Sequence, residues 1–461
     1  MNRPVLASLT ILCLLSVPSV TGLIHLTKAD GGTICIQADG SIVPSTAPIS
    51  TVDNTTYTFT GNVSESTGML AIVVERDSIV LDGQGYTVQG TGNGTGTGIT
   101  LSERNNVTIK NMTITAFGIG IYVCNSSSHN SFSGNNVTAN SYGIVIVYSS
   151  DNSISGNNVT ANKWDGIAVG NSSSYNSFSG NNVTANNEDG IFIDFSSNNS
   201  MNGNILTNNG EGIQFYYSCS NNSVSRNNVA NNGNGTTFYY SSSNNTIYRN
   251  NFMNNTRQVY SSDSTNVWDN GIEGNYWSDY NGADNNQDGI GDTSYIIDAN
   301  NTDHYPLMGR FKSFNVSTWS RPNDGFEEVD VISNSAISNL VLYGWLTTPN
   351  QYLQTGQIFL SLTPVQGQNM TAGFCRITVP NNILNTSDYT VLINMTPVSV
   401  NRLATSNSTQ TTLYFTFNTS PDEIIIVTEF PSFLILPLFF ITTLLGVIFY
   451  RKKHARISGS P

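Results

Sequence analysis

The segment NSFSGNNVTANSYGIVIVYSSD at residues 130–151 decides the fold, because near-copies of it follow without a break. The next copies are NSISGNNVTANKWDGIAVGNSSSY (152–175), NSFSGNNVTANNEDGIFIDFSSN (176–198), NSMNGNILTNNGEGIQFYYSCSN (199–221) and NSVSRNNVANNGNGTTFYYSSSN (222–244). A sixth copy begins at Asn245, so the intervals between successive starts are 22, 24, 23, 23 and 23 residues. A regular period of this length indicates stacked structural repeats.

Apolar and polar residues alternate inside each repeat, which is the pattern of short β-strands. One apolar position is held in successive repeats by Phe132, Ile154, Phe178, Met201, Val224 and Ile247. No repeat contains a helix-length segment, and the common helical repeats need roughly 33–34 residues. The sequence therefore predicts an all-β chain in which each repeat forms one turn of a parallel β-helix solenoid.

Asparagine recurs at one turn of each repeat, as Asn135, Asn157, Asn181, Asn204, Asn227 and Asn250. In stacked turns these side chains would form a column with a spacing of about 4.8 Å. Asparagine tolerates left-handed backbone conformations, and stacked amides can hydrogen-bond along the column. We therefore interpret these residues as structural.

Both ends of the chain carry membrane signals. Residues 1–22 have the basic start and the short apolar run of a secretory signal peptide, with an uncleaved anchor as the alternative. Residues 428–450 include an uncharged stretch long enough for one span, about 28 Å as a helix, and are predicted to be a transmembrane anchor. The basic tail at residues 451–461 places the C-terminus in the cytoplasm, so a single-pass cell-membrane protein with its ectodomain outside is expected.

The ectodomain divides by composition into an N-terminal cap segment (23–75), β-helix repeats (76–270), a C-terminal cap (271–311) and a β-sandwich-like domain of alternating apolar runs (312–427). Only 11% of the residues are charged and the net charge is −13. This balance argues against a nucleic-acid partner, because phosphate binding needs clustered Lys and Arg. Glycosylation sequons such as those at Asn93, Asn136 and Asn158 are compatible with export and a glycoprotein.

The repeats resemble the right-handed parallel β-helix of the NosD-like family, especially large archaeal surface proteins. The block GNYWSDYNGADNNQDGIGDTSYIIDANNTDHYPLM (274–308) resembles the family's terminal block, and TICIQADGSIVPSTAPIS (33–50) resembles its opening. The segment TEFPSFLILPLFF (428–440) is similar to the Pro-Glu-Phe sorting tails of archaeal exported proteins, with Thr428 in place of the first Pro. The resemblance implies envelope localisation and processing at this tail, and the family's name implies copper binding.

Aromatic residues that follow the recurrent Gly-Ile dipeptide are candidate ligand-binding residues. Phe192, Tyr216 and Tyr239 occupy outward strand positions, and Trp164 lies near one end of a strand. Exposed aromatic faces with polar tips suit stacking on sugar rings. The alternative is an aromatic stack that only stabilises the sheet.

Asp165, Asp189 and Glu211 each precede the Gly of that dipeptide in successive repeats. Stacked turns would bring these carboxylates about 5 Å apart, where they repel one another unless a cation lies among them. β-Helical polysaccharide lyases use such an arrangement together with a basic residue, and Lys163 is close in sequence. The alternative is that Asp-Gly and Glu-Gly are ordinary turn dipeptides.

The segment DNNQDGIGD (284–292) is the predicted calcium site, because oxygen ligands alternate in a tight loop as a hard cation requires. The expected ligands are Asp284, Asn286, Asp288, the carbonyl of Ile290, and Asp292. A plain Asn/Asp/Gly-rich turn without metal is the alternative. Copper has no support beyond the family name, because His25, His129, His304 and His454 are scattered.

The sequence thus favours a cell-surface β-helix protein that binds carbohydrate or an envelope polymer and serves adhesion or envelope structure. Two other functions stay open: a polysaccharide lyase or epimerase, and a copper-binding accessory factor.

Overall fold

The computed structural model describes residues 32–317, 326–344, 356–363, 373–381, 383, 389–417 and 423–428. The predicted signal peptide, basic tail and nearly all of the predicted anchor lie outside these residues. In the part of the chain that is described, no helix is long and apolar enough to cross a membrane.

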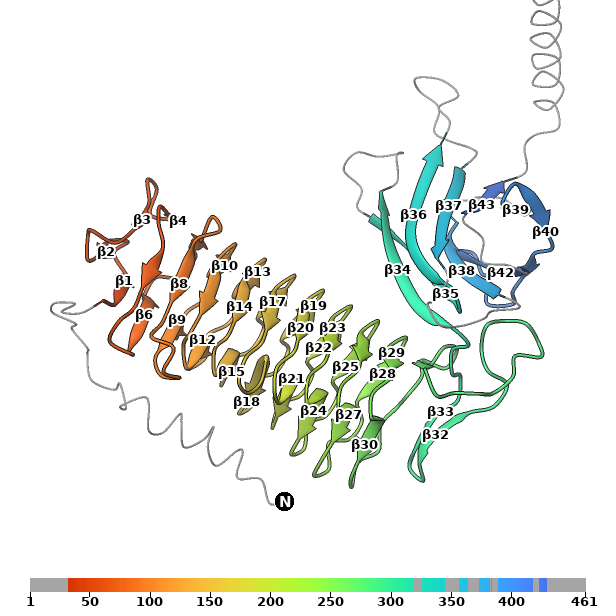
Figure 1. Cartoon of the computed structure of the whole chain (residues 1–461), viewed down its shortest axis with the longest axis horizontal. Coiled ribbons are helices and arrows are strands. Elements are labelled where there is room, and N and C mark those ends of the chain that lie inside the picture. Colours follow the sequence, from red (N-terminus) through yellow and green to blue (C-terminus); the bar gives the residue numbers. More distant parts are fainter. Residues whose placement is uncertain are drawn as a thin grey trace, which may run out of the picture.

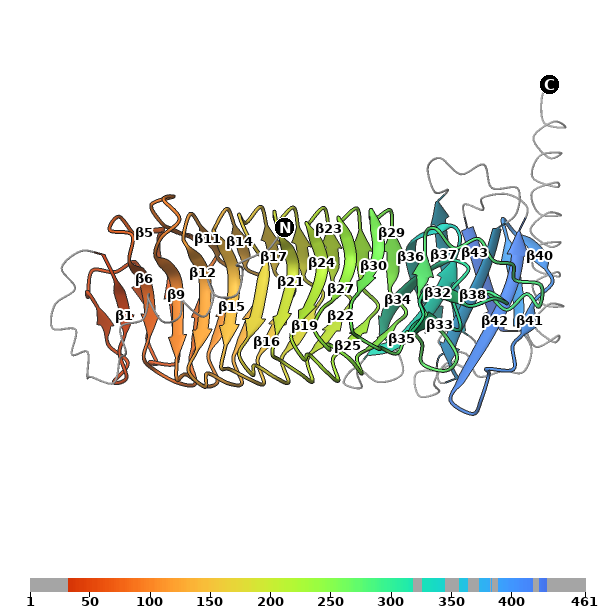
Figure 2. The same ribbon diagram turned by 90° about the horizontal axis from the view of Figure 1, so that it is seen from below.

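The repeats wind into a parallel β-helix with three sheets, which forms the long row of turns in Figures 1 and 2. The first sheet contains β1 (Ile34–Ile36), β2 (Ile42–Val43), β6 (Leu70–Val74), β9 (Thr97–Ser102), β12 (Ile119–Cys124), β15 (Tyr142–Val147), β18 (Ile167–Gly170), β21 (Asp189–Asp194), β24 (Glu211–Tyr216), β27 (Asn234–Phe238) and β30 (Arg257–Ser261). The second contains β3 (Ile49–Ser50), β4 (Thr56–Phe59), β7 (Val80–Asp82), β10 (Thr108–Lys110), β13 (Ser131–Ser133), β16 (Ser153–Ser155), β19 (Ser177–Ser179), β22 (Ser200–Asn202), β25 (Ser223–Ser225) and β28 (Thr246–Tyr248). The third contains β5 (Val63–Ser64), β8 (Thr87–Gln89), β11 (Thr113–Thr115), β14 (Asn136–Thr138), β17 (Asn158–Thr160), β20 (Asn182–Thr184), β23 (Ile205–Thr207), β26 (Asn228–Ala230), β29 (Asn251–Met253) and β31 (Tyr276–Trp277).

One sequence repeat forms one turn, which confirms the predicted solenoid. In the first sheet Ile144 pairs with Ile167, which pairs with Ile191, so equivalent residues of successive repeats lie side by side. Each turn places apolar side chains from all three sheets in one continuous interior core. Because a turn covers its core residues only with the neighbouring turns, the fold is stabilised by stacking.

The turn asparagines form hydrogen-bonded ladders, as the sequence predicts. Asn181 Oδ1 accepts hydrogen bonds from the backbone N–H and the Nδ2 of Asn157 at 3.0 and 3.1 Å. Asn181 Nδ2 donates to the carbonyl of Ile154 and to Asn204 Oδ1 at 2.8 and 3.0 Å. Two parallel ladders pass through Asn176 and Asn186 at the other corners of the coil. The amides therefore satisfy buried backbone groups at the corners, where strand pairing cannot.

Parallel pairing begins inside residues 23–75, where β1 pairs with β6 and β4 pairs with β7. At the other end, β31 adds to β29, and the buried rings of Trp268 and Trp277 lie beneath the last turn. The antiparallel hairpin of β32 (Tyr295–Asp298) and β33 (Asn301–Asp303) follows within the C-terminal cap.

Two five-stranded antiparallel sheets follow the coil and share one apolar core, which confirms the predicted β-sandwich. One sheet has the order β34 (Arg310–Ser317), β35 (Phe326–Ser333), β38 (Gly373–Pro380), β42 (Gln410–Phe417) and β41 (Asn401–Arg402). The other has the order β36 (Ala336–Gly344), β37 (Gly356–Thr363), β43 (Glu423–Thr428), β39 (Tyr389–Ile393) and β40 (Thr396–Val398).

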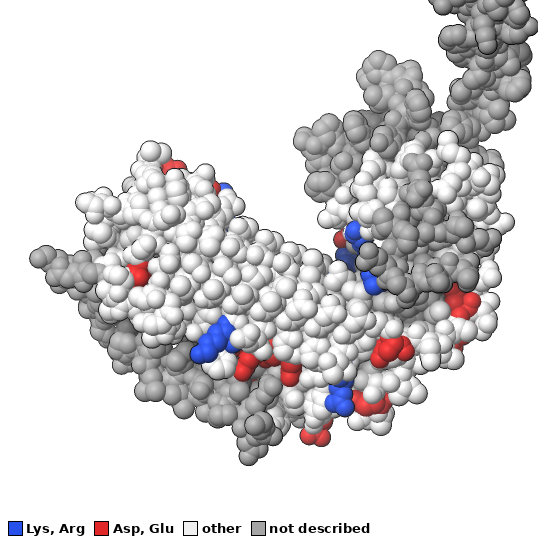
Figure 3. All heavy atoms as spheres, viewed as in Figure 1, with Lys and Arg blue, Asp and Glu red and all other residues white. Residues whose placement is uncertain are grey.

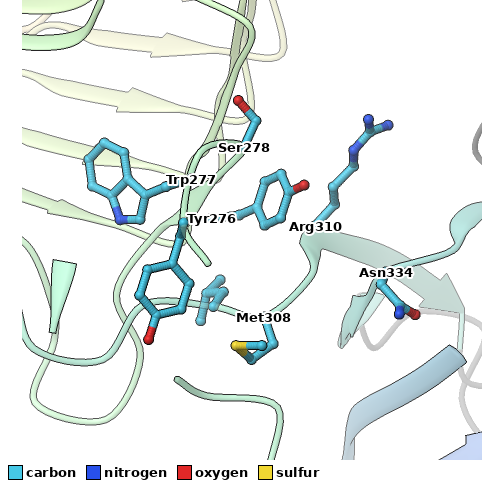
Figure 4. A pocket seen from close by; sticks show the side chains of 8 residues that line it. Tyr276, Trp277, Ser278, Met308, Arg310 and Asn334 are labelled. Carbon is cyan, nitrogen blue, oxygen red and sulfur yellow. The ribbon is translucent and has the colours of Figure 1, made fainter. Parts of the chain in front are cut away.

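Buried ion pairs join the end of the coil to the sandwich. Glu273 of the C-terminal cap forms two ion pairs. Its Oε1 lies 2.7 Å from Nη2 of Arg376 in β38, and its Oε2 lies 2.6 Å from Nε of Arg249 in the last turn. Arg249 also pairs with Asp330 of β35 at 2.9 Å. A cavity of about 190 Å³ lies beside this junction, lined by the side chains in Figure 4. None of the predicted site residues lines it.

Candidate functional site

The outer surface of the first sheet carries most of the predicted site residues. The Gly of the recurrent Gly-Ile dipeptide faces the interior wall: a Cβ on Gly166 would lie 2.6 Å from Val183 Cγ1 and 2.8 Å from the carbonyl of Gly190. Only glycine fits there without displacing these neighbours. The acidic residue just before this glycine lies on the outer side: Glu211 contacts Gln214, the register partner of the outward-facing Phe192, and Tyr142, which is in register with Asp165, packs against the outer cluster around Phe192.

The three predicted carboxylates form a column. Asp189 and Glu211 are register partners in β21 and β24, and Asp165 occupies the same position one turn earlier. Their exposed fractions are only 4–5%. Asp165 Oδ1 accepts the backbone N–H of Asp189 at 3.1 Å, and Glu211 Oε2 accepts Gln214 Nε2 at 2.8 Å. Protein hydrogen bonds thus hold at least two of the three carboxylates in place.

Polar residues extend this column at both ends. Tyr142 precedes Asp165, and burial, followed by the charges of Asp165 and Glu188, raises the pKa of its phenol. Asn234 and Arg257 follow Glu211 in register, so the column ends in a cation that the sequence analysis did not identify. Chemically, the column offers adjacent carboxylates and one distant guanidinium.

The predicted aromatic residues do not form one surface. Trp164 is 36% exposed, with Lys163 Nζ 5.2 Å above its ring, and lies at the start of the strands beside the carboxylates. Tyr216 and Tyr239 lie at the strand ends, with ring centroids 5.8 Å apart. With a rise of about 3.3 Å per residue, a six-residue strand separates the two groups by roughly 17 Å.

Phe192 lies between these groups and is not exposed. Its side chain points away from the interior core, yet only 3% of it is accessible. It packs in an outer cluster with Val145, Ala168 and Tyr122. The sequence indicated its outward direction, but the surrounding side chains of the outer sheet surface cover it, so it offers no open ring face.

An aromatic ladder that the sequence analysis missed lies on the turn after the first sheet. Phe195 and Tyr217 stack with centroids 5.0 Å apart and planes at 7°, and Tyr217 and Tyr240 stack at 4.5 Å and 13°. Phe195 is 49% exposed and Tyr240 is 48% exposed. Tyr216 contacts Tyr217 and Tyr240 edge-on, at 4.4 and 5.1 Å. We call Phe195, Tyr217 and Tyr240 the aromatic ladder.

The backbone explains why these rings project from the coil. Tyr148, Phe195, Tyr217 and Tyr240 all have φ between 43° and 53°, in the left-handed region. At such a residue the strand alternation ends, and the side chain points out from the corner of the coil. A signal was present in the sequence, because an aromatic residue precedes Ser-Ser or Ser-Cys in these repeats.

Asp194 is a further residue that was not predicted. It lies one position before Phe195 and is 1% exposed. Among the described residues its Oδ1 has no hydrogen-bond partner. Burial raises the pKa of its carboxyl group to about 7. Asp194 is therefore a buried acid whose charge changes near neutral pH.

The predicted calcium loop packs against the sandwich. Asp284 Oδ1 and Oδ2 accept the backbone N–H groups of Asp288 and Gly289, each at 2.9 Å, and Gly289 has φ +83°. Asp288 Oδ1 accepts the N–H of Ile290 at 2.8 Å. The carbonyl of Asp288 accepts Arg376 Nη1 at 2.8 Å. Burial raises the pKa of the Asp288 carboxyl group, and the Arg376 charge opposes this effect.

The oxygen donors of this loop suit calcium chemically, but they do not converge. Within the described residues, no group of three or more His, Cys, Asp or Glu side chains is placed to hold a metal ion. The histidines that could bind copper are also far from one another in sequence and contact other residues. His304 Nδ1 lies 3.0 Å from Asp269 Oδ2, and His129 Nδ1 lies 3.2 Å from Ser128 Oγ. His25 and His454 lie outside the described residues. Neither described histidine belongs to a cluster of three or more His, Cys, Asp or Glu side chains that could hold a metal ion.

The coil surface around the ladder carries little charge. Between Lys110 and Arg226 the charged residues are Asp151, Lys163, Asp165, Glu188, Asp189, Asp194 and Glu211. In Figure 3 most of the visible coil surface is uncharged, and the charged side chains gather along its lower edge. A ligand on such a surface must be recognised by hydrogen bonds and apolar contacts.

The family model described as periplasmic copper-binding protein (NosD) matches residues 39–282, about half of the chain. No curated protein is similar enough in sequence to count as a relative of this chain.

Similar solved structures include two epimerases and a tailspike protein. A double mutant of the periplasmic alginate epimerase AlgG is 17% identical, covers 45% of this chain and 62% of its own, and has a TM-score of 0.33. The A-module of the Azotobacter vinelandii mannuronan C-5 epimerase AlgE4 is 14% identical, with coverages of 49% and 75% and a TM-score of 0.33. The Dettilon tailspike protein is 13% identical, with coverages of 81% and 86% and a TM-score of 0.38. Similarity at this level does not inform the chemistry of the chain.

Proposed function

This chain belongs to the NosD family, and we propose that its β-helix binds a polysaccharide of the cell envelope or its surroundings. The binding surface is the aromatic ladder together with Tyr148, which occupies the same turn position in an earlier repeat. The protein would act in adhesion or envelope structure, held at the cell membrane by residues 428–450. Recovery of the full chain in the membrane fraction, resistant to alkaline carbonate, tests this anchoring.

One observation carries the binding proposal: exposed aromatic side chains recur at equivalent turns on a nearly uncharged surface. Tyr148, Phe195 and Tyr240 are each about half exposed, at 52, 49 and 48%. Large exposed rings cost solvation free energy unless a ligand or partner covers them. A row of rings along the coil axis suits an extended polymer, and the tyrosine hydroxyl groups supply hydrogen bonds to it.

Affinity electrophoresis through gels that contain soluble polysaccharides tests this function. We expect the wild-type chain to be retarded by at least one neutral polysaccharide, and Tyr240→Ala to be retarded less. The matched control is Tyr175→Ala, because Tyr175 is 62% exposed but lies outside the ladder. Equal retardation of all three proteins would contradict binding at the ladder, and no retardation of the wild type would contradict the function.

A lyase or epimerase is the second candidate, favoured by the column of Asp165, Asp189 and Glu211. Both reactions remove a proton beside a uronate carboxyl group, so they need carboxylate neutralisation and a base. Incubation with acidic polysaccharides and calcium, followed by ultraviolet absorbance for unsaturated ends and NMR for epimerised residues, distinguishes the two. Product with the wild type and none with Asp189→Asn would support this function, whereas binding without product would exclude it for the substrates used.

For the loop at residues 284–292 we propose a structural calcium ion that fixes the coil end against the sandwich. Asp284, Asp288 and Asp292 supply the hard oxygen ligands, and a modest rearrangement of their side chains would be required. Millimolar calcium should then raise the melting temperature, and Asp288→Ala should remove that rise. Asp263→Asn, at an exposed residue outside the loop, is the control. If millimolar calcium leaves the melting temperature of the wild type unchanged, the proposal is wrong and the segment is a turn that binds no calcium.

A further inference from the structure

We propose that the turn at Asn171 is a slot for one pyranose ring, bounded by the rings of Tyr148 and Phe195. This inference rests on the proposed polysaccharide binding and assigns it a subsite. The slot exists because a small polar residue replaces an aromatic one in the column of turn residues that runs from Tyr148 to Tyr240.

The register places Asn171 between the two rings. Val147 pairs with Gly170, and the N–H of Tyr148 donates to the carbonyl of Gly170, so Tyr148 and Asn171 occupy equivalent positions in successive turns. Val169 pairs with Ile193, so Asn171 and Phe195 are equivalent as well. The φ angles of Tyr148, Asn171 and Phe195 are 50°, 57° and 43°. All three side chains therefore leave the same corner of the coil.

The spacing of the ladder gives the size of the slot. Rings in adjacent turns are 4.5–5.0 Å apart, so rings two turns apart are separated by about 9–10 Å. A sugar ring inserted midway would lie 4.5–5.0 Å from the aromatic ring on each side, which is the distance between stacked rings of the ladder. The space above Asn171 thus accepts one ring and no more.

The stacking also explains why binding should concentrate at this position. Phe195, Tyr217 and Tyr240 lie nearly parallel and cover the faces of one another, so that mainly ring edges remain inside the ladder. The face of Phe195 that points toward Asn171 has no aromatic neighbour in the adjacent turn. Only such an open face offers the full apolar area that sugar stacking uses.

Polar groups border the slot. Asn171 is half-buried and its amide can donate to and accept from hydroxyl groups, and Tyr148, which is 52% exposed, supplies a hydroxyl group as a second hydrogen-bonding partner. Gly170, next to Asn171, leaves space beside it: a Cβ there would have Asp194 as its nearest neighbour, at 3.9 Å. The adjacent acid disfavours an anionic sugar, because two carboxylates would repel one another in this desolvated place.

These features select the stereochemistry of the ring. A sugar held between two aromatic faces must present C–H groups on both sides, and this requires equatorial hydroxyl groups throughout. The ligand class is therefore an uncharged β-gluco-configured pyranose within a linear chain. Sugars with an axial hydroxyl group have only one apolar face and lose one of the two contacts.

Filling the slot tests the proposal. We would titrate cellohexaose by calorimetry into the full chain, made in a host without N-glycosylation because Asn171-Ser172-Ser173 is a sequon, and kept in a non-glycosidic detergent. Asn171→Tyr completes the ladder and should reduce affinity at least tenfold without lowering the melting temperature. Tyr148→Ala should reduce affinity about two- to tenfold, the value of one ring contact. Mannohexaose should bind more weakly than cellohexaose.

Two variants keep the test specific. Asn125→Tyr makes the same substitution in the same column on the far side of Tyr148, and it should leave affinity unchanged. Adding Tyr217→Asn to Asn171→Tyr moves the gap by two turns and should restore binding. Unchanged affinity in Asn171→Tyr, with Tyr240→Ala still impaired in gel retardation, would refute the slot and leave the proposed function standing. Failure of every polysaccharide to bind the wild type would overturn both.

Discussion

Replacing Asn181 by alanine should destabilise the coil far more than the same change at Asn182, the next residue along the chain. Asn181 faces inward at a corner and is fully buried, whereas Asn182 lies on the outer side of β20. The two positions share a residue type and a repeat. Their difference therefore isolates the free energy that a ladder amide contributes.

The magnitude follows from the hydrogen bonds of Asn181. Without its side chain, the buried backbone N–H of Asn157 loses its acceptor, which costs about 1–3 kcal/mol. Three further hydrogen bonds, to Asn157 Nδ2, the Ile154 carbonyl and Asn204 Oδ1, are lost at about 1 kcal/mol each. The free energy of unfolding should fall by about 4–6 kcal/mol.

The control should lose much less. Asn182 Nδ2 donates to Asn158 Oδ1 at 2.7 Å and Asn182 Oδ1 accepts from Thr184 at 2.7 Å, but these groups are partly exposed and water can replace the bonds. A loss of about 1 kcal/mol or less is expected for Asn182→Ala. Urea unfolding followed by circular dichroism measures both variants. Equal destabilisation would refute the view that the inward ladder, and not asparagine content as such, holds the corners.

Three further predictions concern buried groups. Ile193→Asp should cost several kcal/mol in thermal unfolding, because it places an unpaired charge in the interior core; a loss under about 1 kcal/mol would contradict the assigned direction of this residue. Burial raises the pKa of Asp303 to about 6. In this pH range the Asp303 carboxyl group keeps its proton in the native state but loses it in the unfolded state. The stabilisation from this proton should therefore fall by up to about 3 kcal/mol as pH rises from about 4 to 6. If the free energy of unfolding of Asp303→Asn kept the same dependence on pH as the wild type, this would be contradicted. The thiols of Cys35 and Cys219, whose pKa values burial raises to about 12 and 11, should react with a disulfide reagent only on unfolding; rapid labelling of the native chain would show that they are accessible.

The sequence predicted the coil well because its physical cause is local. Alternation places Phe178 and Val183 inside, and stacking at a fixed period repeats the same choice in every turn. The contacts at the coil end could not be predicted in this way. Arg376 and Glu273 are 103 residues apart and lie in unlike folds, so no periodicity connects them.

The candidate site was predicted less well, for a different reason. Strand alternation gives the direction of Phe192 correctly, but it does not give exposure, which depends on the size of neighbours such as Ala168 and Gln214 in the adjacent turns. Alternation also ends at Phe195 and Tyr217, where the backbone enters the left-handed region. The most exposed rings thus lie where strand reasoning stops, and turn chemistry has to be considered at the same positions.

A solenoid converts a substitution at one turn into a defined distance on its surface. The stacked strands fix the separation of successive turns at about 4.8 Å, whatever side chains the turns carry. An aromatic residue at a turn therefore adds a ring at a set spacing, and a small residue such as Asn171 removes one without changing the positions of its neighbours. The interior ladders make this possible, because they hold the corners independently of the outer residues. Ligand preference in such a chain can change one turn at a time while the core that supports it stays the same.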